Sequence, residues 1–118
     1  MRRPLWLFFA LILGVACDKA TLEPLPLDVT LSASKTAAVP GETINFTANA
    51  RGGNLIGLQM DYADTSAGDQ YGTSGARTAQ VTFHHAFGAA GTYVVTVTVT
   101  DGLAGEKKAS VTVRVAAP

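Results

Sequence analysis

The sequence predicts an all-β domain, an antiparallel sandwich of about seven strands over residues 28–118, preceded by an apolar N-terminal segment and a linker. Three observations lead to this prediction. From Asp28 onward apolar and polar residues alternate with a period of two, which is typical of half-buried strands. Turn-forming residues separate the alternating segments, and no sustained helical period interrupts them. Six or seven short strands at this spacing favour a β-sandwich.

The N-terminal segment, residues 1–16, has the composition of a cleaved export signal. Arg2 and Arg3 provide a positive start, and the twelve residues 5–16 form an unbroken apolar run. A helix of that length spans about 18 Å, well short of the ~30 Å hydrocarbon core of a bilayer. The run therefore predicts a signal peptide rather than a membrane span.

Cys17 directly follows this run and is the only cysteine of the 118 residues, so no disulfide can form within the chain. The residues Gly14-Val15-Ala16-Cys17 resemble a bacterial lipobox. The resemblance implies that the Cys17 thiol receives a diacylglycerol and that cleavage leaves Cys17 as the new N-terminus. The alternative is an ordinary secretory signal followed by an incidental thiol.

Residues 17–27 contain Pro24 and Pro26 and no clear period, which predicts a short, semi-extended linker. Removal of residues 1–16 leaves seven Lys and Arg against nine Asp and Glu, a net charge of −2. So small a net negative charge argues against long-range attraction of the whole chain to nucleic acid or to an anionic membrane surface, and we expect no nucleic-acid partner.

The strands are predicted from their apolar faces. In chain order these faces are Val29, Leu31 and Ala33; Ile44, Phe46, Ala48 and Ala50; Ile56, Leu58, Met60 and Tyr62; Ala79, Val81 and Phe83; Tyr93, Val95, Val97 and Val99; and Val111, Val113 and Val115. Residues 51–54 are expected to break the second strand from the third. The Gly-, Ser- and Asp-rich stretch 63–75 is predicted as a loop, with a short strand near 70–73 as an open alternative.

Two segments resemble the PKD domain, an immunoglobulin-like module common in bacterial surface and secreted proteins. Residues 85–93 (HAFGAAGTY) and the valine–threonine strand 94–100 match one motif, and Met60-Asp61-Tyr62-Ala63-Asp64-Thr65 keeps both aspartates of another. The resemblance covers about residues 28–116 and implies an immunoglobulin-like sandwich. Tyr93 then occupies the place of a tyrosine corner, whose hydroxyl bonds a nearby backbone group.

Candidate metal ligands are few. His84 and His85 are adjacent on a strand and point to opposite faces, so they do not share an ion; one is expected in solvent and the other as a loop anchor. Asp61, Asp64 and Asp69 are weak candidates for a structural calcium site, although aspartates in such turns commonly bond their own backbone. We expect no other metal and no cofactor.

No catalytic constellation stands out either. Neither histidine lies at a spacing that pairs it with a serine nucleophile and a third orienting group, so we expect the protein not to be an enzyme.

The aromatic residues indicate which part of the domain is the candidate contact surface. Of the six that follow Cys17, five fall on predicted core faces or at a family packing position, and only Tyr71 is left over. Asp69, Gln70 and Tyr71 are therefore the candidate contact loop.

The leading functional hypothesis is an exported, membrane-anchored lipoprotein that presents its module to a protein partner at the cell envelope. The alternatives are a structural spacer and a weak calcium-dependent carbohydrate-binding module.

Overall fold

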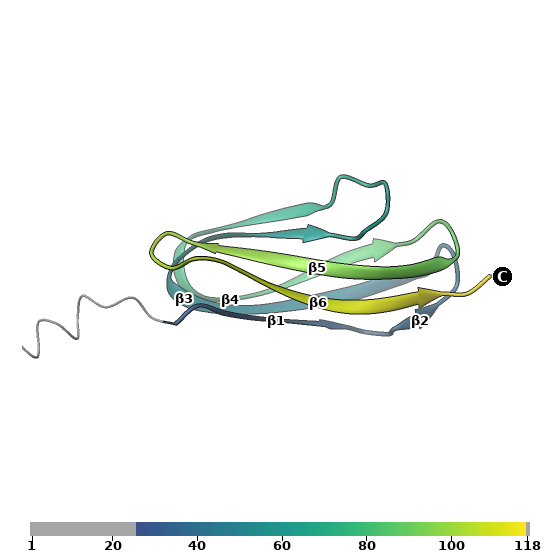
Figure 1. Ribbon diagram of the computed structural model, residues 1–118, viewed down its shortest axis with the longest axis horizontal. Helices are drawn as coiled ribbons and strands as arrows, with labels where there is room; N and C mark the ends of the chain where they lie inside the picture. The colour runs from purple at the N-terminus through teal and green to yellow at the C-terminus, as the bar shows by residue number, and fades with distance from the viewer. Residues whose placement is uncertain (1–25, 118) are drawn as a thin grey trace, which may run out of the picture.

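The computed structural model describes residues 26–117, which form two layers of β-structure with no helix (Figure 1). The strands are β1 (Asp28–Ala33), β2 (Ala37–Ala38), β3 (Thr43–Asp61), β4 (Asp69–Ala86), β5 (Gly91–Asp101) and β6 (Gly105–Val115). Within the described range nothing helical is available to cross a membrane. The predicted signal peptide, Cys17 and most of the linker lie outside this range.

Two long strands belong to both layers. The first half of β3 pairs with β1 and with the second half of β4, which makes one layer. Its second half pairs with the first half of β4 and with β5. In this other layer β5 also pairs with β6, and β6 pairs with the short parallel strand β2. The predicted antiparallel sandwich is confirmed, with β3 and β4 each supplying two of its strands.

The predicted period of two places the core between the layers. Phe46, Val95, Val97 and Val113 are fully buried, and the residues between them on each strand are more exposed. Burial of one apolar face per strand is the main favourable contribution to folding, at about 25 cal/mol per Å² of apolar surface. The polar partners of this alternation, such as Thr96 and Thr98, face outward.

The third predicted apolar face is wrong at its first residue. Leu55 is 0% exposed and Ile56 is 50% exposed, whereas the alternation predicted Ile56 in the core. The register of β3 shifts between Arg51 and Leu55 and again between Leu55 and Gly57. A bulge adds residues to one strand only, and a shift of one residue exchanges the two faces. The predicted break at 51–54 is therefore a bulge within a continuous strand.

A buried carboxylate fixes this bulge. Asp101 is 3% exposed; its Oδ2 accepts the Asn54 N–H at 2.9 Å, and its Oδ1 accepts those of Leu103 at 2.7 Å and Ala104 at 3.1 Å. The hydrogen bond from the Asn54 N–H is the main reason why the pKa of Asp101 lies below its ordinary value. Burial would raise this pKa, but the hydrogen bonds from the backbone amides together outweigh it. A Cβ on Gly52 would lie 2.3 Å from Oδ2, so any larger residue there would displace the carboxylate from its amide partners.

Leu55 and Ile56 give a matched pair of substitutions. We expect Leu55→Ala to lower the free energy of unfolding by about 2–5 kcal/mol, because it leaves a cavity in the core. Ile56→Ala is expected to change it by less than about 0.5 kcal/mol, because the side chain is half exposed. Urea denaturation of both variants measures the difference, and equal losses would contradict the bulged register.

Asp101 predicts a specific acid dependence. Because its folded pKa lies below the unfolded value of about 3.9, its contribution is present above that pH and is lost as the pH falls through the folded pKa. Asp101→Asn should lower the urea midpoint at neutral pH and weaken the decline of that midpoint in acid. Glu106→Gln, in the same hairpin and exposed, is the control; an identical response from both variants would refute the assignment.

Candidate functional site

The predicted contact residues begin a strand. Asp69, Gln70 and Tyr71 are the first three residues of β4 and pair with Met60, Gln59 and Leu58 of β3. The prediction of a loop over 63–75 is thus corrected: only residues 62–68 lie outside strands, and the alternative of a strand near 70–73 is confirmed. Pairing with a core strand overrides the weak β-propensity of glycine and serine.

Tyr71 is the exposed aromatic residue that the sequence predicted. Its exposed fraction is 51%, whereas Phe46, Tyr62, Phe83 and Phe87 are buried and Tyr93 is half-buried. It lines an open groove of about 300 Å³ together with Ile56 and Gly72. It also lines a second hollow of about 210 Å³, where the two halves of β4 diverge.

The strand that carries Tyr71 is an edge. Within residues 26–117, β4 pairs only with β3, so one side of its backbone has no strand neighbour. Residues 69–76 contain neither lysine nor proline, the residues that commonly protect such edges. The hydroxyl oxygen of Thr73, on the wall of the second hollow, is buried and has no hydrogen-bond partner among the described residues. This edge therefore has unused hydrogen-bonding capacity beside an exposed aromatic ring.

The three candidate calcium ligands each have other partners. Asp61 accepts the Ala63 N–H at 2.9 Å, and Asp69 accepts the Tyr62 hydroxyl at 2.5 Å. Asp64 accepts the Ser66 N–H at 3.0 Å. Among the residues that the structure describes, no three acidic, histidine or cysteine side chains gather to hold a metal ion.

Asp64 and His85 fasten the 62–68 loop to the end of β4. His85 Nε2 lies 2.7 Å from Asp64 Oδ2, and its ring stacks on Tyr62 with centroids 3.8 Å apart and planes within 2°. Burial alone would raise the pKa of Asp64, but hydrogen bonds from Ser66 and His85 outweigh it and lower that pKa. Burial, helped by the bond to Asp69, raises the pKa of Tyr62 above its ordinary value. These contacts tie the loop next to the contact residues to both ends of β4.

The two histidines behave as the sequence predicted. His85 anchors the loop, and His84 is exposed, with Nδ1 2.6 Å from Asn45 Oδ1 on the neighbouring strand. Tyr93 also has its predicted role, because its hydroxyl donates to the Ala89 carbonyl at 2.7 Å. These aromatic and imidazole rings are therefore structural.

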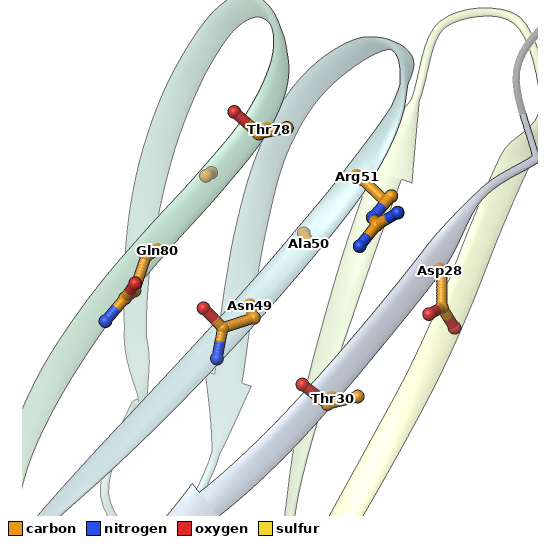
Figure 2. A pocket seen from close by; sticks show the side chains of 8 residues that line it. Asp28, Thr30, Asn49, Ala50, Arg51, Thr78 and Gln80 are labelled. Atoms are coloured by element: carbon orange, nitrogen blue, oxygen red, sulfur yellow. The ribbon is translucent and has the colours of Figure 1, made fainter.

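A second surface, which the sequence analysis missed, lies on the outer face of β1, β3 and β4. An open hollow of about 360 Å³ lies on this face. Figure 2 shows the polar and small side chains that line it. Thr30, Asn49 and Gln80 lie across its floor, and Arg51 and Asp28 lie at one end. It contains no aromatic side chain to stack on a sugar ring. The sequence shows that polar residues alternate along these strands. It does not show which of them lie side by side, because that depends on the register between the strands.

Comparisons with known proteins agree with this architecture. The family model described as the PKD domain matches residues 28–115. The PKD domain of an M14-like peptidase from Thermoplasmatales archaeon SCGC AB-540-F20 superposes with a TM-score of 0.64 at 23% identity, covering 80% of this chain and 97% of that one.

The CARDB domain of the PF1109 protein from Pyrococcus furiosus, solved in complex with di-metal ions, has a TM-score of 0.62 at 13% identity, covering 82% of this chain and 98% of that one. At these identities the two structures establish a shared fold. No curated protein matches the chain.

Proposed function

Because this chain belongs to the PKD domain family, we propose that it is a non-enzymatic, exported lipoprotein that presents its module to a protein partner at the cell envelope. Modules of this family commonly serve in interaction or adhesion, and they typically occur in secreted or extracellular proteins. The N-terminal sequence supplies the proposed export signal, and Cys17 the proposed lipid anchor. Two or more acyl chains make such an anchor stable.

The observation that carries the interaction role is Tyr71 on the free edge of β4. Tyr71 is 51% exposed, and the adjoining backbone has no neighbouring strand within the described residues. A partner can add a strand to such an edge, with main-chain hydrogen bonds giving affinity and the two hollows beside Tyr71 receiving side chains. Tyrosine is well suited to this role, because it offers a large contact area and few rotatable bonds. Asp69 and Gln70 complete the proposed contact segment.

The lipid anchor is tested by intact mass spectrometry of the protein extracted from membranes. We expect a polypeptide that begins at Cys17 and carries the mass of the acyl chains. The Cys17→Ala variant should lack this modification and leave the membrane fraction. Cleavage at another residue, or a free thiol at Cys17, would refute the anchor.

The contact segment is tested by photo-cross-linking in cells. A photoreactive phenylalanine at position 71 should give one reproducible adduct with an envelope protein. The same residue at position 94 is the matched control, because Val94 is also 51% exposed but lies on the outer face of β5.

With the partner identified, Tyr71→Ala should weaken its binding by about 2 kcal/mol, typical of an interfacial aromatic anchor, whereas Val94→Ala should leave the affinity unchanged. Equal adducts at both positions, or full affinity in Tyr71→Ala, would favour the alternative role of a spacer without a recognition site.

A further inference from the structure

Positive charge gathers at the end of the sandwich where the described chain begins. Of the six lysines and arginines in residues 26–117, four lie toward this end, on the β3 and β4 bends and on β6; they are Arg51, Arg77, Lys107 and Lys108. All four side chains are exposed. We call the surface formed by Arg51, Arg77 and Lys107 the basic end.

These three cations surround one hollow. It measures about 520 Å³, and its other walls include Pro26, Leu27 and Gly52. Lys107 Nζ lies 3.7 Å from Asp28 Oδ1, and neither arginine has an ion pair within the described chain. Figure 2 shows Arg51 beside β1 at the rim of the sheet.

Acidic groups at this end do not cancel the charge. Asp28 and Glu106 are the exposed carboxylates near the four basic residues, and Asp101 is buried against backbone amides. Toward the opposite end the balance reverses, because Glu42, Asp61, Asp64 and Asp69 outnumber Lys35 and Arg114. The module therefore has a positive end and a negative end. A negatively charged surface would attract the first and repel the second.

Exposed aliphatic side chains accompany the cations. Leu103 is 61% exposed in the β5–β6 turn, and Ile56 is 50% exposed with its side chain next to Gly102 of the same turn. Cations flanked by exposed aliphatic groups fit the headgroup region of a bilayer, where phosphates meet the first acyl carbons.

The number of residues between Cys17 and Leu27 limits the distance between the proposed lipid and the basic end. Cys17 is ten residues before Leu27, and ten residues extend at most about 35 Å. With the proposed lipid on Cys17, the basic end is the part of the module closest to the membrane.

We propose that the basic end docks on the anionic surface of the membrane that holds the Cys17 lipid. The three cations contact lipid phosphates and Leu103 lies at headgroup level, so the long axis of the sandwich stands away from the bilayer. This docking rests on the proposed lipid anchor at Cys17, and it specifies which end of the module faces the membrane.

The test uses the exported full-length protein in vesicles of phosphatidylcholine, alone or mixed with phosphatidylglycerol. A fluorescent amino acid is placed at Ala104 in the β5–β6 turn or at Ala89 in the turn before β5, and a quencher is attached to lipid headgroups. We expect quenching at 104 only, in the anionic vesicles, and reversed by high salt.

Matched variants identify the cations. The triple variant Arg51→Gln, Arg77→Gln and Lys107→Gln should lower the ratio of docked to undocked protein by about fivefold per cation, about a hundredfold together. The control variant Lys35→Gln with Arg114→Gln removes cations near the other end and should leave quenching at 104 unchanged.

Each remaining outcome refutes a defined claim. Lipidated protein that shows equal quenching at 104 and 89, no dependence on lipid charge, or full quenching in the triple variant overturns the docking alone. Protein whose intact mass shows no lipid on Cys17 overturns the anchor, and the docking with it.

Discussion

The structure depends on one carboxylate at the point where β3 passes from one layer to the other. The bulge after Arg51 leaves backbone N–H groups that no strand can pair, and the turn after β5 leaves two more. Asp101 accepts hydrogen bonds from both places, and Gly52 gives its carboxylate room. Because each half of β3 sets the register of a different layer, this contact aligns both halves of the core. Loss of the carboxylate would leave these partly buried amides without their acceptor, and an unsatisfied donor costs more than the bond contributes when it is formed.

Most of the fold was predictable because alternation reports burial directly wherever a strand stays within one layer. β5 and β6 do so, and Val95, Val97 and Val113 are in the core as predicted. The prediction failed where a strand changes layers. The sequence does not show how many residues a bulge contains. Ile56 was therefore predicted in the core, where the structure has Leu55. The start of β4 was predicted as a loop, with a short strand near 70–73 only as the alternative, for another reason. Its glycines and serines have weak β-propensity, and it is extended because β3 pairs with it.

The candidate site was predictable only in part. Tyr71 emerged by elimination, since every other aromatic residue of the domain had a place in the core, and the anchoring role of His85 followed from its position at a strand end. The partner of that histidine, Asp64, comes from a distant turn and needed the structure to identify. The basic end could not be predicted at all. Arg51, Arg77 and Lys107 are far apart in sequence, and only the shared position of two bends and a hairpin brings them around one hollow.

The short strand β2 gives the module a mechanical property. β1 starts at the end of the sandwich opposite to the C-terminus, and β2 runs parallel to β6, the strand that leads to that terminus (Figure 1). The Arg114 N–H donates to the Thr36 carbonyl at 2.8 Å, and the Ala116 N–H donates to that of Ala38 at 2.9 Å. Tension between an anchored N-terminus and a load on the C-terminus would pull these bonds in shear, so they must break together rather than one by one. Resistance to such tension is set by the unfolding rate, and it would let this small module transmit force.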